Sequence, residues 1–356
     1  RYTVLLKATY DLTDTTSVYF MYNLGHNEQT GLSTFHQEQN IIVPICDAPD
    51  ANPYFNATSL YNEACNVQHL KSITVGKQEE ALGGYQFLQR DTTMRETVGF
   101  KGVLFGDWAW DGYYTHGQTP QRTPLLSNVL EGNYLASIYA VQGPNGVPVC
   151  GPVDTNPNLQ PGSIGSGRAS QVQPGCQPFN IFGPTVNMLA GNGKSLSTAG
   201  VPDRIRNNPT ASLDAVNYVA HTTESGSYYQ QDVIAANLHG TPFSTWAGPV
   251  SMAMGVEHRR EGGRSYTDAF GAQNYSLSNN GTNYQGSFAV TEGYVEFGIP
   301  LASDLSWAES LNMDVAVREA GYSLAGNYMT YKIGLDYRPN DWLRFRATNS
   351  RDVREP

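Results

Sequence analysis

The chain has 356 residues, of which 40% are hydrophobic and 15% are charged, and its mean hydropathy is −0.40. These values are too polar for a helical membrane protein, and no run approaches the roughly 18 apolar residues that a spanning helix needs. The net charge of −10 argues against nucleic acid as a partner.

Alternation of apolar and polar residues with a period of two predicts about ten strands. The first four are expected at 2–10, 16–25, 89–105 and 108–117, and two more at 227–240 and 250–259. The stretch from 292 to the end holds the last four, which carry charged residues on one face and large apolar residues on the other. Residues 125–141 and 210–220 have weak helical patterns.

The predicted connections alternate between short and long. Those at 11–15, 106–107, 241–249, 302–310 and 339–342 are short, those at about 27–88, 118–226 and 261–286 are long, and 321–327 is intermediate. Short turns at one end and long loops at the other are typical of outer-membrane barrels. We therefore expect an all-β fold, an antiparallel up-and-down transmembrane β-barrel with short periplasmic turns and long extracellular loops. A lectin-like stack with its binding loops at one end is the nearest soluble alternative.

Four cysteines lie in the two longest loops, and four cysteines allow three pairings. The local pairing, Cys46 with Cys65 and Cys150 with Cys176, closes loops with 18 and 25 residues between the partners. Such stapled loops fit an oxidising compartment. Free or metal-bound thiols are the alternative, but no C-x-x-C pair or Cys/His cluster supports a metal site.

The catalytic motifs that the sequence partly resembles are incomplete. Gly193-Lys194-Ser195 resembles the end of a phosphate loop, but Met188 stands where the first glycine is required. The seven histidines are scattered, and no serine sits in a G-x-S-x-G elbow. We expect no enzyme activity, no cofactor and no metal.

Four stretches in order resemble the barrel of TonB-dependent outer-membrane receptors, of the long-loop type found in alphaproteobacteria and xanthomonads. Residues 176–183 (CQPFNIFG) resemble a loop motif of that family, and 240–261 resemble its G-P-containing hairpin. Residues 292–301 (EGYVEFGIPL) and 343–356 (LRFRATNSRDVREP) resemble two of its strands.

The resemblance implies that residues 1–356 are part of a receptor barrel of about 22 strands, whose plug domain and C-terminal strands lie outside the chain. It implies a bacterial outer-membrane location and energised uptake of a ferric siderophore or a similar scarce nutrient. The implied partners are the TonB–ExbB–ExbD complex, acting through the plug, outer-membrane lipid and a small-molecule ligand. Three alternatives remain: an oligosaccharide-importing receptor of the same family, a secreted carbohydrate-binding β-sandwich, and a passive porin.

Charged residues on the polar positions of the predicted strands would face the barrel interior and the plug under this resemblance. Simple ion pairs on a wet strand face are the alternative, and Glu292 with Glu296 also suggest a glycosidase acid/base pair. The candidates are Glu257, Arg259, Glu292, Glu296, Asp314, Arg318, Lys332, Asp336, Arg344 and Arg346. Candidate substrate contacts at the loop ends of strands are Tyr113, Tyr114, His116, Tyr228 and Tyr229. An interfacial aromatic girdle would equally explain these residues.

Overall fold

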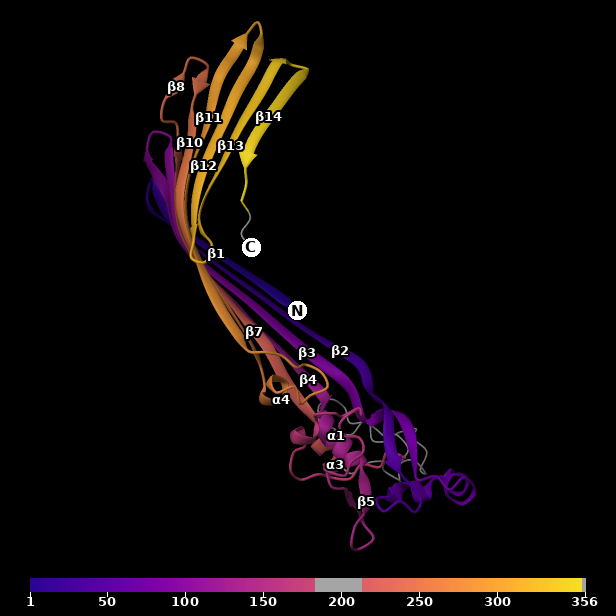
Figure 1. Ribbon diagram of the computed structural model, residues 1–356. Helices are drawn as coiled ribbons and strands as arrows, with labels where there is room; N and C mark the ends of the chain where they lie inside the picture. The colour runs from indigo at the N-terminus through magenta and orange to yellow at the C-terminus, as the bar shows by residue number, and fades with distance from the viewer. Residues whose placement is uncertain (183–212, 354–356) are drawn as a thin grey trace.

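The computed structural model describes residues 1–182 and 213–353, and it consists mainly of one long, curved sheet (Figure 1). Ten antiparallel strands lie in the order β1-β2-β3-β4-β7-β10-β11-β12-β13-β14, so each pairs with its neighbour in sequence among the ten. The all-β, antiparallel, up-and-down prediction is confirmed. The sheet is open, with β1 and β14 at its edges. The strands are β1 (Tyr2–Thr13), β2 (Thr16–Pro44), β3 (Ser72–Phe105), β4 (Trp108–Val129), β7 (Ala220–Gly240), β10 (Ser251–Thr267), β11 (Tyr284–Leu305), β12 (Ala308–Tyr322), β13 (Gly326–Asn340) and β14 (Leu343–Arg351).

The predicted separation of short turns from long loops is also confirmed. Connections of two residues join β1 to β2, β3 to β4, β11 to β12 and β13 to β14 at one end of the sheet. A small hairpin, β8 (Ser244–Thr245) with β9 (Gly248–Pro249), joins β7 to β10 at the same end. The long connections and all helices gather at the opposite end (Figure 1).

The predicted loops 27–88 and 118–226 were too long, because much of each is strand. β2 continues to Pro44, β3 starts at Ser72, β4 continues to Val129 and β7 starts at Ala220. Period-two alternation appears only where one face is apolar and the other wet. In 27–40 (NEQTGLSTFHQEQN) both faces are mostly polar, so the pattern disappears although the backbone ladder between β2 and β3 continues.

The two helical predictions were partly right. Residues 125–141 contain α1 (Glu131–Ile138), but they begin as the end of β4 and finish in β5 (Ala140–Gln142), which pairs with β6 (Pro148–Cys150). Residues 213–219 form α3 (Leu213–Val219), and 210–212 lie outside the described residues. The other short elements are η1 (Pro53–Ala57), η2 (Asn62–Val67), η3 (Ala169–Gln171) and α4 (Ala269–Ala272). No helix among the described residues has the length and hydropathy to cross a membrane.

The sheet has its large apolar residues on the outside. In β7, Ile234 is 58% exposed, whereas its neighbours Val233 and Ala235 are 8% and 6% exposed. This is the opposite of the arrangement in a soluble sheet, whose large apolar residues are buried. The exposed apolar face includes Val4, Leu6, Val98, Phe100, Ile234, Val256, Val317, Ile333, Leu335 and Phe345.

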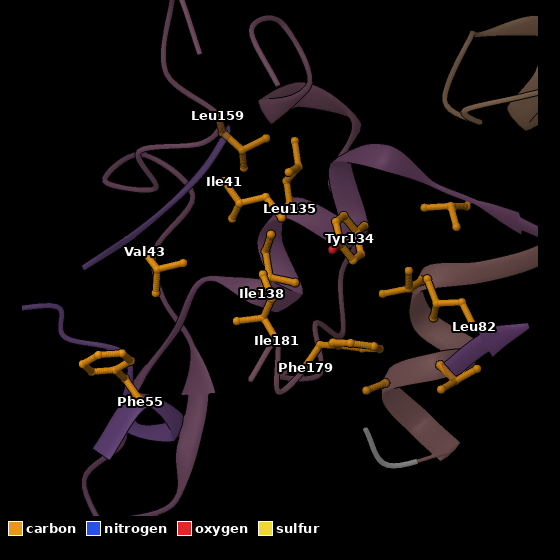
Figure 2. Packing of buried hydrophobic residues seen from close by; sticks show 14 of the residues in the cluster. Ile41, Val43, Phe55, Leu82, Tyr134, Leu135, Ile138, Leu159, Phe179 and Ile181 are labelled. Atoms are coloured by element: carbon orange, nitrogen blue, oxygen red, sulfur yellow. The ribbon is translucent and has the colours of Figure 1, made fainter. Parts of the chain in front are cut away.

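The hydrophobic core lies in a compact module at the loop end, which we call the cap (Figure 2). The cap comprises the ends of β2 to β4, the connections 45–71 and 130–182, and α3. Tyr134, Leu135 and Ile138 of α1 pack against Ile41 and Val43 of β2 and against side chains of the second connection. All eight residues of α1 are buried. Two loops far apart in sequence therefore fold into one unit.

Candidate functional site

All ten predicted interior charges lie on one face of the sheet, which we call the polar face. Residues directly opposite each other in an antiparallel pair point to the same side. Glu257 is opposite Glu292, and Arg318 is opposite Tyr294, which has the same parity as Glu292. Asp336 is opposite Arg346. The prediction of a shared face is therefore correct, while contact with a plug remains a prediction.

Ion pairs join several of these charges. Arg318 Nη1 lies 3.3 Å from Glu292 Oε1, and Arg259 lies 3.5 Å from Glu257 and 3.0 Å from Glu261. On β13, Asp336 accepts from Arg344, and Arg346 lies 3.3 Å from the same carboxylate. Pairs at such exposed positions contribute only about 0–1 kcal/mol each to stability.

Three of the charges form no ion pair within the described part of the chain: Glu296, Asp314 and Lys332. They line a hollow of about 620 Å³ near the short-turn end of the polar face, together with His239 and Ser251. The remaining seven candidates are Glu257, Arg259, Glu292, Arg318, Asp336, Arg344 and Arg346, all in the ion pairs above. The unpaired set therefore offers both signs of charge to a further partner on this face.

The glycosidase alternative loses support from the geometry. Glu292 and Glu296 are four residues apart on β11, which corresponds to about 13 Å along a strand. Paired catalytic carboxylates lie roughly 5–9.5 Å apart. Glu292 also forms an ion pair with Arg318.

The five candidate substrate contacts are not at loop ends, which corrects the prediction. Tyr113, Tyr114 and His116 lie inside β4, and Tyr228 and Tyr229 lie inside β7, because both strands extend much further than expected. The five residues are also divided between two faces. Tyr113 and Tyr229 are on the polar face, while Tyr114, His116 and Tyr228 are on the apolar face.

A polar contact joins two of these residues on the apolar side. Tyr114 Oη donates to Asp232 Oδ1 at 2.6 Å, and His116 Nδ1 lies 2.8 Å from the same oxygen. The trio lies where the large apolar residues of β4 and β7 end. This position suits the edge of an apolar band, as in the girdle alternative.

The predicted local disulfides are confirmed. Cys46 is bonded to Cys65 and Cys150 to Cys176, and no free cysteine is present among the described residues. The first bridge closes the 45–71 connection and the second joins β6 to the later part of the other long connection. In the described part of the chain, no group of three or more His, Cys, Asp or Glu side chains is placed to hold a metal ion.

Buried asparagines hold the cap backbone together. Asn158 pairs with both the N–H and the carbonyl of Ile42, at 2.8 and 2.9 Å. Asn156 donates to the carbonyl of Leu135 at 2.9 Å, and Asn52 donates to that of Ile138 at 3.2 Å. These bonds satisfy backbone groups that burial would otherwise leave without partners. Sequence reasoning treated such Asn-rich segments as loops and missed this role.

A buried titratable cluster lies where β2, β3 and α1 meet in the cap. Glu79 is opposite His36 in the β2–β3 register, and both side chains are almost fully buried. Tyr134 Oη donates to Glu79 Oε1 at 2.8 Å, and Lys77 Nζ lies 3.5 Å from Glu79 Oε2. Tyr85 Oη lies 3.3 Å from His36 Nδ1. No pattern in the sequence indicated this cluster, because His36, Lys77, Glu79 and Tyr85 fall in the segment 27–88 that was predicted as a loop.

Burial controls the protonation of this cluster. Desolvation lowers the pKa of His36 to about 4. Desolvation also raises the pKa of Glu79, against the opposing effects of Lys77 and the Tyr134 hydroxyl. The pKa of Tyr134 is raised by its burial and by the Glu79 carboxylate. The cap is therefore built around a neutral imidazole.

No family model matches this chain, and neither does any curated protein.

Proposed function

We propose that this chain forms part of the wall of a TonB-dependent outer-membrane receptor that takes up a ferric siderophore or a similar scarce nutrient. The observation that carries the proposal is the two-sided sheet: exposed large apolar residues on one face, charges on the other, and the four two-residue turns together at one end. The family motifs in 176–183, 240–261, 292–301 and 343–356 agree with this interpretation.

The height of the apolar band supports a membrane wall. On β12 and the turn before it, ten residue steps separate Trp307 from Val317, or about 33 Å along the strand. A tilt of about 40° reduces this to roughly 25 Å along the membrane normal, the height of the apolar band on outer-membrane barrels.

The tryptophans support the same orientation. All five lie at the short-turn end: Trp108 and Trp110 follow the β3–β4 turn, and Trp246, Trp307 and Trp342 lie in or beside turns. Tryptophan gathers at the level of lipid headgroups, where one part of the ring is apolar and the N–H is wet. We therefore assign the short-turn end to the periplasmic side and the cap to the extracellular side.

A sheet in lipid cannot leave backbone groups without hydrogen-bond partners. The proposal therefore requires that the outer edges of β1 and β14 pair with further strands. In the uptake cycle, this chain would supply wall, loops and polar-face charges that contact the plug. The TonB–ExbB–ExbD complex would supply the energy by pulling on that plug.

A carbohydrate-binding β-sandwich is the runner-up from another class. It needs a second sheet packed on the first, with a core about 10 Å thick between them. Among the described residues the only other sheets are the two-stranded pairs β5–β6 and β8–β9. An oligosaccharide importer or a porin of the same wall type shares this fold and differs in ligand and energy source.

One substitution separates a membrane wall from a soluble sheet. Ile333 is the middle member of the apolar face of β13, and Thr348 is an exposed position on the polar face of β14. In the protein expressed from its complete reading frame, Ile333→Arg should destabilise the folded state in lipid vesicles by about 2–4 kcal/mol. Thr348→Arg should change its stability by less than about 0.5 kcal/mol. Equal, small effects of both substitutions would refute the membrane assignment.

Energised transport needs its own experiment. Uptake of the labelled nutrient by cells that express the protein should stop when TonB is deleted, although the protein still reaches the outer membrane. Uptake that continues without TonB would support the porin alternative instead. Induction by iron starvation, as opposed to growth on a plant polysaccharide, would favour a siderophore over an oligosaccharide.

A further inference from the structure

A second hollow on the polar face, of about 920 Å³, lies between the apolar band and the loop end, and we call it the aromatic groove. Its floor is formed by Gly263 of β10 and Gly286 of β11, which are directly opposite each other. Tyr229 of β7 is opposite Gly263 on the other side, and Tyr284 and Phe288 flank Gly286 along β11. Gly263 is seven residues beyond Val256, so the groove lies roughly 23 Å above that apolar position.

The two glycines give the groove its depth. A Cβ on Gly263 would lie 3.0 Å from Cδ1 of Tyr229, so the tyrosine ring rests directly on this glycine. A Cβ on Gly286 would meet nothing within 4 Å, so the space above it is open. Glycine inside a strand costs stability, and such positions often mark the close approach of a ligand.

The aromatic side chains present unused faces to this space. Tyr229 is 54% exposed and Tyr284 is 64% exposed, and neither ring stacks on another ring of the described chain. Most of the groove surface is therefore apolar and flat. Exposed aromatic rings around an open floor are suited to stacking against a flat apolar surface of a ligand.

Paired hydrogen-bonding groups border the rings. Gln231 Nε2 donates to Glu261 Oε1 at 3.0 Å, and Thr119 Oγ1 lies 3.3 Å from Thr93 Oγ1. Among the described residues that line the groove, Arg95 is the one basic side chain. A carboxylate, an amide and hydroxyls can form hydrogen bonds with the neutral hydroxyl groups of a ligand. A strongly negative ligand would be repelled by Glu261 and by the net charge of −10.

We propose that the aromatic groove binds a neutral oligosaccharide, with the apolar faces of pyranose rings on Tyr229 and Tyr284 and the hydroxyls on Glu261 and Gln231. The inference rests on the proposed function, because it takes the polar face as the interior that an imported ligand passes. Within the receptor function it selects the oligosaccharide alternative over the ferric siderophore, because Glu261 in the groove disfavours an anionic iron chelate.

Calorimetry on the detergent-purified protein, expressed from its complete reading frame, tests the groove directly. The probes are cellotetraose, maltotetraose and xylotetraose, with a ferric tris-catecholate for comparison. We expect at least one tetrasaccharide to bind and the anionic chelate not to bind. Tyr229→Ala should weaken the binding about tenfold, and Gly286→Trp should abolish it by filling the open floor.

The matched control is Gly334→Trp on the polar face of β13, about 40 Å away along the strands. A Cβ at Gly334 would meet only ordinary contacts of 3.7 Å or more. This variant should bind the tetrasaccharide as the unaltered protein does. Binding of the chelate alone, binding that survives both Tyr229→Ala and Gly286→Trp, or no binding of any tetrasaccharide would overturn the proposal. The binding measurement does not require TonB. If the protein binds a tetrasaccharide through the groove but does not take it up, the result counts against the transport function and leaves the groove proposal intact.

Discussion

Acid should open the cap because His36 is buried as a neutral imidazole. The side chain is 1% exposed, and its burial holds its pKa at about 4, against 6.5 when it is exposed. Between these values the unfolded chain binds a proton that the folded cap excludes. The stabilisation is therefore complete above about pH 6.5 and is lost as the pH falls toward 4. A difference of 2.5 pKa units corresponds to about 3 kcal/mol of cap stability.

Glu79 acts in the opposite direction, because its raised pKa favours the protonated carboxyl in the folded cap as the pH falls. The wild-type slope alone would therefore mix two contributions. His36→Gln removes the titrating ring and leaves Glu79 in place, so the comparison of the two proteins isolates His36.

Amide hydrogen exchange of α1, corrected for the intrinsic effect of pH, measures the free energy of cap opening in the intact protein. We expect wild-type cap stability to fall by up to about 3 kcal/mol more than that of His36→Gln between pH 7.5 and 4. Since Gln is a poorer fit, the variant should start from a lower stability at pH 7.5. Parallel pH profiles in the two proteins would refute the argument that the neutral His36 ring controls the acid response.

Two further changes probe the cap. Leu135→Ala removes a fully buried side chain of α1 and should lower the cap stability measured by hydrogen exchange by about 2–5 kcal/mol. The control Leu60→Ala, at an exposed site, should lower it by under about 0.5 kcal/mol. Equal effects of the two substitutions would contradict the core shown in Figure 2. Replacing both Cys46 and Cys65 with serine frees a loop with a sequence separation of 19 residues, which should cost about 3 kcal/mol. Unchanged exchange in 45–67 after this replacement would show that the bridge does not constrain the cap.

The C-terminal half of the sheet was predictable because each of its strands has one apolar and one charged face. Val315 and Val317 alternate with Asp314 and Arg318, and the pattern alone fixes the face of each residue. The short turns were predictable for a related reason: segments such as Gly106-Asp107 interrupt two adjacent patterned strands.

The extent of the strands and the cap were not predictable from local pattern. His36 and Glu79 are neighbours only because β2 and β3 continue to pair through several register shifts between residues 32 and 41. That pairing depends on contacts more than 40 residues apart in sequence. The five candidate substrate contacts were predicted at loop ends for the same reason, because the sequence of a strand that continues without alternation resembles that of a loop.

The cap and the aromatic groove divide the loop end into two parts with separate roles. The cap core draws its residues from β2, β3, β4, α1, α3 and the connections between them, whereas β12 and β13 end at a connection of three residues. The groove is lined by residues of β3, β4, β7, β10 and β11, and Tyr229 is ten residues, or about 33 Å, from the core residue Val219. Because Tyr229 and Tyr284 are exposed while the cap is folded, a ligand can reach the groove without any rearrangement of the cap. Acid and disulfide loss should therefore act on the cap, and ligand affinity should depend on the glycine floor and its rings.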